Sequence, residues 1–216
     1  MSDDILDHLA RDLKPAKPLS VKALGIGAAV ATVLAAVYIF VLYGARPELK
    51  ALLGGDFSID PMAWFKPLLF IAIGAGALWS VADLARPEGR LRLRTLAPLL
   101  IALGFVLVAL VADLFARGFG AFRNIGDPSV LCVLTIVCGG GAGLILMWRL
   151  WLRRAATSHP GVLGAMSGLA AASLMAAAYA VHCDRDTPVY ILGIYGGGVA
   201  IVTAVAAVLG RRLLRW

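Results

Sequence analysis

Residues 24–43 read LGIGAAVATVLAAVYIFVLY, a run of 20 residues without a single charge. An α-helix rises 1.5 Å per residue, so a run of this length spans the roughly 30 Å hydrocarbon core of a bilayer. Lipid offers no hydrogen bonds to backbone groups, so a segment that crosses it must satisfy its own as a helix. We therefore expect residues 24–43 to form a transmembrane helix.

Five further runs are also mainly apolar and long enough to span the bilayer. They cover residues 62–84, 95–115, 128–150, 160–181 and 187–210. The chain is 61% hydrophobic and only 15% charged, whereas a soluble domain is about half apolar and about a quarter charged. The sequence therefore predicts an all-α, polytopic membrane protein, with a six-helix transmembrane domain over residues 21–216 that is surrounded by membrane lipid.

The basic residues indicate how the chain is oriented. Six spans place both termini on one side of the membrane. Of the 20 Lys and Arg residues, 14 lie in the termini and loops of that side and 6 on the opposite side. Cytoplasmic loops carry an excess of Lys and Arg, so we expect both termini to be cytoplasmic. The longest connection, residues 44–61, then lies outside and has room for a short interfacial helix.

The first 20 residues carry an amphipathic pattern. The apolar positions that share one helical face are Ile5, Leu6, Leu9 and Leu13. A helix of about 12 residues is marginal alone in water, so this face needs a partner. Helices that lie on membranes usually have a basic polar face, whereas this one is mainly acidic. The pattern favours a partner protein over the membrane surface.

Glycines four residues apart recur in the last three spans. The pairs are Gly139/Gly143, Gly164/Gly168 and Gly193/Gly197. Small residues at this spacing let helix backbones approach closely in lipid, so we expect all three pairs to lie at helix contacts. A phosphate-binding loop is excluded, because no Lys-Ser/Thr follows the run from Gly139 to Gly143.

Two carboxylates stand at span ends in a repeated Val-Ala-Asp-Leu phrase. Asp83 is followed by Arg86, and Asp113 by Arg117. Carboxylates within membranes can serve as proton or ion sites, so a small transporter or channel is one alternative. The neighbouring arginines favour interfacial ion pairs instead. No catalytic triad, metal-binding His pair or paired carboxylates occur in the spans, so we do not expect an enzyme, and we expect no cofactor.

Two cysteines that are distant in sequence fall at the same predicted depth. Cys132 lies about one turn inside the outer end of the fourth span, and Cys183 directly follows the fifth span. Two thiols beside His182 and Asp184 are typical of a soft-metal or redox site, although buried cysteines also serve as small apolar residues. The second interpretation suits Cys138, which lies about 9 Å deeper.

Several motifs together carry a resemblance to a known family. They are Arg153–Arg154, His159–Pro160, the run YAVHC at residues 179–183, Asp186, GRRLLRW at residues 210–216, LARDLKP at residues 9–15, and Cys132. In these motifs the chain resembles the NrsF-like family of bacterial inner-membrane anti-sigma factors. One departure is Ile194, where the family usually has Trp before the tyrosine that is retained here as Tyr195.

The resemblance implies a protein that restrains an extracytoplasmic-function (ECF) sigma factor of the SigF type at the inner membrane. The cytoplasmic segment 1–20 would bind the sigma factor through Ile5, Leu6, Leu9, Asp12 and Leu13. Cys132 and Cys183, with His182, would sense metal or oxidative stress at the outer face, and the two thiols would bind metal transiently. Direct contact with nucleic acid is not implied. A structural subunit that uses its glycine faces to bind another membrane protein is a further alternative.

Overall fold

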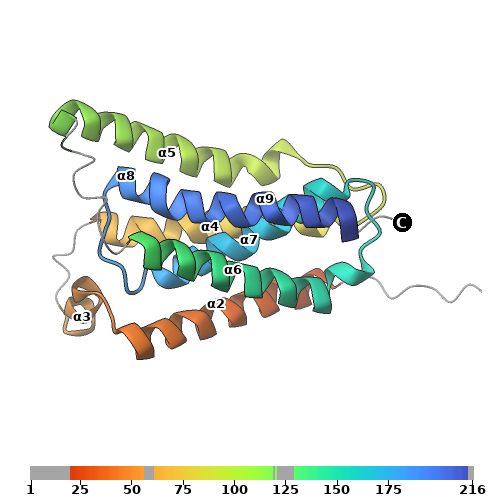
Figure 1. Ribbon diagram of the computed structural model, residues 1–216, viewed down its shortest axis with the longest axis horizontal. Helices are drawn as coiled ribbons and strands as arrows, with labels where there is room; N and C mark the ends of the chain where they lie inside the picture. The colour runs from red at the N-terminus through yellow and green to blue at the C-terminus, as the bar shows by residue number, and fades with distance from the viewer. Residues whose placement is uncertain (1–19, 56–60, 119, 121–128, 214–216) are drawn as a thin grey trace, which may run out of the picture.

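The computed structural model describes residues 20–55, 61–118, 120 and 129–213 of the chain. These residues are mostly helical, and no strand occurs among them. Six helices are long and apolar enough to cross a membrane, and they lie side by side in one bundle (Figure 1). The predicted all-α, six-span fold is confirmed.

The span boundaries follow the uncharged runs of the sequence. The helices are α2 (Val21–Tyr43), α4 (Pro61–Leu84), α5 (Leu93–Arg117), α6 (Ser129–Leu150) and α7 (Pro160–Tyr179), and the last span comprises α8 (Pro188–Tyr190), the π-helical turn η3 (Ile191–Tyr195) and α9 (Gly196–Leu213). The predicted ends differ from these by at most three residues. The short helix expected in the longest connection is α3 (Pro47–Leu53).

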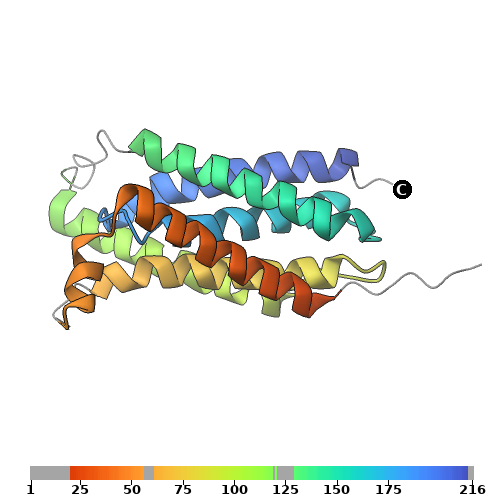
Figure 2. The same cartoon turned by 90° about the horizontal axis from the view of Figure 1, so that it is seen from below.

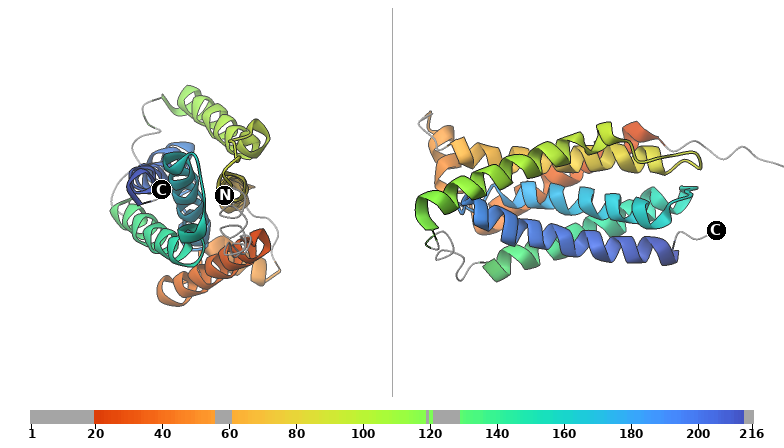
Figure 3. Two further views of the ribbon diagram at one scale, coloured as in Figure 1. Left: turned by 90° about the vertical axis from the view of Figure 1, so that its right-hand side faces the viewer. Right: turned by 90° about the horizontal axis from the view of Figure 1, so that it is seen from above.

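Helix α7 is the centre of the bundle, because it contacts α9, α4, α6 and α2. Most of its residues are Gly, Ala and Ser, and most are buried. Small side chains let several neighbours approach one helix, which is how membrane bundles pack without a hydrophobic effect between helices. By contrast, α5 lies at the edge of the bundle, mainly against α4 (Figure 3).

The glycine pairs of the fourth and fifth spans lie at helix contacts as predicted. A Cβ atom on Gly168 would lie 2.5 Å from the Ala206 Cβ of α9, and one on Gly164 would overlap the Ala206 carbonyl. A Cβ on Gly139 would overlap the side chain of Met175 on α7. Gly164 and Gly168 therefore require glycine for α7 and α9 to pack as closely as they do, whereas a side chain at Gly139 would only displace the flexible end of Met175.

The prediction for the sixth span is wrong. A Cβ atom on Gly193 or Gly197 would meet nothing within 4 Å, so this pair makes no close helix contact among the described residues. The π-helical turn changes the register of this span, and both glycines line an apolar groove instead. The close contacts of the span are made by Gly198, against Ile136, and by Gly210, against Gly164.

The two ends of the bundle differ in character. We call the end at which α2 begins and α9 stops the terminal end, and the opposite end, with α3 and residues 180–187, the cysteine end (Figure 1). Helix α2 runs obliquely from one end to the other across the bundle (Figure 2). The predicted partner-binding residues Ile5, Leu6, Leu9, Asp12 and Leu13 lie outside the described residues.

Candidate cysteine site

Two free thiols lie buried at the cysteine end. Cys132 is in the first turn of α6 and is 1% exposed, and Cys183 follows α7 and is 6% exposed. The Cys132 thiol donates a hydrogen bond to the Tyr179 hydroxyl at 3.5 Å, and its sulfur lies 3.0 Å from the Tyr190 hydroxyl. The fold thus places two cysteines that are 51 residues apart in one buried cluster, in which two phenol groups contact Cys132.

The π-helical turn explains why two tyrosines of one span reach this place. Tyr190 and Tyr195 are five residues apart, which in an α-helix would point them about 140° away from each other. A π turn closes its hydrogen bonds five residues apart and brings such positions onto one face. Both tyrosines are buried, and their rings lie 6.2 Å apart. The hydroxyl of Tyr195 has no hydrogen-bond partner among the described residues.

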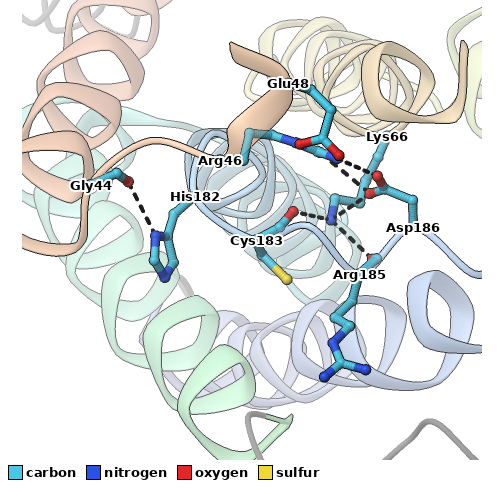
Figure 4. A network of polar contacts seen from close by, with 8 residues as sticks. All are labelled: Gly44, Arg46, Glu48, Lys66, His182, Cys183, Arg185 and Asp186. Carbon is cyan, nitrogen blue, oxygen red and sulfur yellow. Dashed lines mark hydrogen bonds and ion pairs between the residues drawn. The ribbon is translucent and has the colours of Figure 1, made fainter. Parts of the chain in front are cut away.

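Lys66 fixes the backbone that carries Cys183. This lysine is 0% exposed, and its ammonium donates to the carbonyl of Cys183 at 2.7 Å and to that of Arg185 at 3.0 Å. It also pairs with Asp186 at 2.9 Å (Figure 4). In addition, its ammonium lies 4.8 Å above the ring of Tyr195. A buried charge is costly unless it is paired and hydrogen-bonded, and here both conditions are met.

Arg46 connects the same segment to the turn after α2. Its guanidinium makes two contacts with the Asp186 carboxylate and one with Glu48 at 3.1 Å (Figure 4). Its backbone N–H donates to the carbonyl of Val181 at 3.1 Å. With Lys66, these side chains form a neutral cluster of two cations and two carboxylates. The cluster joins the α2–α3 turn, α4 and residues 181–186 into one unit.

The ion pairs shift the pKa of the groups in the turn. The hydrogen bond from Arg46 lowers the pKa of the Glu48 carboxyl. Burial alone would lower the pKa of Arg46, but hydrogen bonds to Asp186 and Glu48 outweigh burial and raise it. Both groups are therefore held in their charged forms at neutral pH.

Cys183 has the more acidic thiol of the pair. The interaction with the Cys132 side chain lowers the pKa of Cys183 most, burial opposes this shift, and the charge of Lys66 lowers the pKa further. The thiolate is the form that attacks oxidants and binds soft metals, so a lowered pKa makes this thiol reactive near neutral pH. The site therefore pairs Cys183, whose pKa is lowered, with a second buried thiol.

His182 points away from the thiols and toward α2. Its Nδ1 atom lies 3.1 Å from the carbonyl of Gly44, to which it must donate, and its ring lies 5.4 Å from that of Tyr43 (Figure 4). Gly44 ends α2 with a φ of 80°, a left-handed conformation that favours glycine. In the described residues, no group of three His, Cys, Asp or Glu side chains is arranged to hold a metal ion. Asp184 is exposed, and so is Cys138 on α6.

Sequence reasoning did not identify Lys66 and Arg46 as parts of this site. A signal for Lys66 was present, because it lies within the apolar run 62–84, where a charge is costly and usually functional. Arg46 carried no comparable signal, since a basic residue in a turn beside a span is ordinary.

Only one of the two predicted Asp-Arg ion pairs is formed in the structure. Asp113 pairs with Arg117 at 2.6 Å as predicted. Asp83 has no ion pair among the described residues, so the predicted pair with Arg86 is not formed. Arg86 lies beyond the end of α4 and is exposed, which removes it from the helical position that such a pair needs. The two carboxylates lie at opposite ends of the bundle and do not form one site.

Residues 9–216 match the family described as "NrsF: Negative regulator of sigma F". The chain belongs to the NrsF family. It is 29% identical over 228 aligned positions to the anti-sigma-F factor NrsF of Caulobacter vibrioides, covering 100% of this chain and 99% of that protein. A probable anti-sigma-F factor NrsF of Azospira oryzae is also 29% identical, over 90% of this chain and 87% of its own length. No solved structure matches the chain.

Proposed function

We propose that this protein is an anti-sigma factor that holds an ECF sigma factor of the SigF type at the bacterial inner membrane and releases it under metal or oxidative stress. Membership of the NrsF family supports the regulatory class, which is not a class of enzymes. The observation that carries the sensing part is the buried pair Cys132 and Cys183, whose environment acidifies one thiol and ties it to the turn after α2.

The thiol pair suits two kinds of signal. A peroxide oxidises the two thiols to one disulfide, taking up two electrons and the two thiol protons, and is itself reduced to water or an alcohol. A soft metal ion displaces the same protons and binds the two thiolates, which are the ligands such ions prefer. In both cases the tyrosine hydroxyls that now contact Cys132 lose their present partner.

Two helices, α6 and α2, connect the thiol pair with the terminal end and could transmit a structural change. Helix α6 begins beside Cys132, and Trp151 directly follows it. Helix α2 begins after Ser20 and ends at Gly44, which is held by His182. The routes meet where the Trp151 indole donates to the carbonyl of Ser20 at 3.3 Å. A shift of α6 relative to α2 therefore acts on the residue from which the segment 1–19 extends.

The sigma factor has to meet the segment 1–20 in the cytoplasm. The start of α2 and the end of α9 lie at the same end of the bundle, so both face the same side of the membrane. The excess of Lys and Arg at this end supports placing it in the cytoplasm and the cysteine end outside. Stress agents that arrive from outside would then reach the thiols first.

The binding step is tested by the apolar face of the N-terminal segment. Leu9→Asp places a charge on a face that would be buried against the sigma factor, at a typical cost of several kcal/mol if the charge is unpaired. We expect this variant to insert normally but to lose the sigma factor during purification from membranes. Asp3→Asn is the control, because Asp3 lies at the start of the pattern and off the apolar face. Full retention of the sigma factor by Leu9→Asp would remove the segment from the mechanism.

A further inference from the structure

A groove opens between α2 and α4, away from the cysteine site. Its volume is about 740 Å³, and Leu174 of α7 contributes to its wall. The groove exists because α2 packs mainly on α7 and makes few contacts with α4. The lining residues on which the argument depends are Val21, Gly25, Val33, Trp79, Asp83 and Arg86.

The groove has the length of one bilayer leaflet. From Val21 to Val33 the lining of α2 rises about 18 Å at 1.5 Å per residue, somewhat more than half of a hydrocarbon core of about 30 Å. Small residues keep its wall open, and a Cβ atom on Gly25 would meet nothing within 4 Å. A single acyl chain in an extended conformation fits a space of this length and polarity.

Only the end of the groove nearest the terminal end carries charge. Asp83 and Arg86 both line it there, one acidic and one basic, and neither has an ion pair among the described residues. By contrast, the corresponding residues at the cysteine end, Asp113 and Arg117, form an ion pair with each other. The groove therefore presents one free charge of each sign at the level where lipid headgroups lie.

We propose that this groove binds one phospholipid with an ethanolamine headgroup. The acyl chain fills the apolar length, the phosphate pairs with Arg86, and the ammonium group donates hydrogen bonds to Asp83. A phosphatidylglycerol headgroup supplies no cation for Asp83, and a choline headgroup has no N–H to donate to a carboxylate. The pair of opposite charges thus selects ethanolamine over both.

Native mass spectrometry of the full-length protein tests the headgroup. The protein is released from mixed micelles that contain phosphatidylethanolamine, phosphatidylglycerol and phosphatidylcholine in equal amounts, and the retained lipids are counted. We expect one retained phosphatidylethanolamine in the wild type. Asp83→Asn and Arg86→Gln should each lower its retention about tenfold, since charge-assisted hydrogen bonds are among the strong ones.

Matched variants separate this site from the general charge of the surface. Glu88→Gln and Arg90→Gln remove one exposed charge of each sign from the same connection but do not line the groove, and they should retain the lipid as the wild type does. Equal retention of the three lipids by the wild type, or equal losses in all four variants, would overturn the proposal.

The acyl part is tested by filling the groove. Gly25→Leu adds a side chain that projects into the groove, whereas Gly27→Leu adds the same side chain at an exposed position outside it. Phosphatidylethanolamine brominated on its acyl chain, added at one equivalent per protein so that little reaches the exposed face of Trp79 from outside the groove, should quench the fluorescence of Trp79, measured as the difference from Trp79→Phe. We expect Gly25→Leu to abolish this quenching and Gly27→Leu to keep it. Quenching that survives in Gly25→Leu, or a dimer whose contact fills the groove without lipid, would contradict the assignment.

Discussion

Replacing Lys66 by Met tests how the cysteine site is built. Methionine has a similar length, so it fills the same space but removes the ammonium group. The change leaves the buried carbonyls of Cys183 and Arg185 without their donor and takes one cation from Asp186. Removing one partner of a buried ion pair costs about 3–5 kcal/mol, although Arg46 remains to hold Asp186.

Two separate effects on Cys183 follow from this loss. Without the positive charge, the pKa of the Cys183 thiol rises, so the thiolate forms at higher pH than in the wild type. The segment that carries Cys183 also opens more easily, and 3–5 kcal/mol corresponds to an opening constant that is at least about a hundredfold larger. The first effect moves the pH midpoint of alkylation upward, and the second raises the rate reached at high pH.

The rate of alkylation by iodoacetamide, followed by peptide mapping of Cys183 across a pH series, separates the two effects. The background variant is Cys138→Ser, so that the exposed thiol does not react. Lys50→Met is the matched control, because Lys50 is an exposed lysine of α3 outside the cluster. If Lys66→Met leaves both the midpoint and the high-pH rate as they are in the wild type, Lys66 does not organise this site.

Two further predictions concern stability. The pKa of Glu48 is lowered by its hydrogen bond from Arg46, so this stabilisation is complete above the unfolded-state pKa of about 4.3 and is lost as the pH falls through the lower folded-state value. The thermal midpoint should therefore drop as the pH falls below about 4.3, and a variant with Glu48→Gln should show a smaller drop. Gly164→Ala should destabilise the bundle by about 1–3 kcal/mol through overlap with Ala206, whereas Gly197→Ala should change little; equal unfolding midpoints for the two variants would contradict the packing described.

The parts of the fold that could be predicted from sequence depend on local properties. The six spans follow from the length and the apolar composition of each run, and their ends agree with the helices within three residues. The equal depth of Cys132 and Cys183 follows from span order alone, since consecutive spans run in opposite directions and place both residues at one level, whereas their proximity also requires that α6 and α7 be neighbours. These inferences need no knowledge of which helix contacts which.

The remaining features depend on contacts between distant segments. His182 was expected beside the thiols, but Gly44, 138 residues away, provides the acceptor that turns its ring toward α2. Lys66 lies within a predicted span, but its role depends on carbonyl groups of the segment after α7, which the sequence does not place beside it. The glycines of the last span lie away from helix contacts because a π turn changes the register, and the spacing of small residues does not reveal such a turn.

The most direct test of the proposed function measures how much sigma factor remains bound to purified membranes before and after treatment with cadmium or peroxide. The wild-type protein and Cys138→Ser should release the sigma factor on treatment. The double variant Cys132→Ser, Cys183→Ser should keep it bound, because neither a disulfide nor a thiolate–metal bond can form. Release from the double variant at the wild-type level would contradict the account.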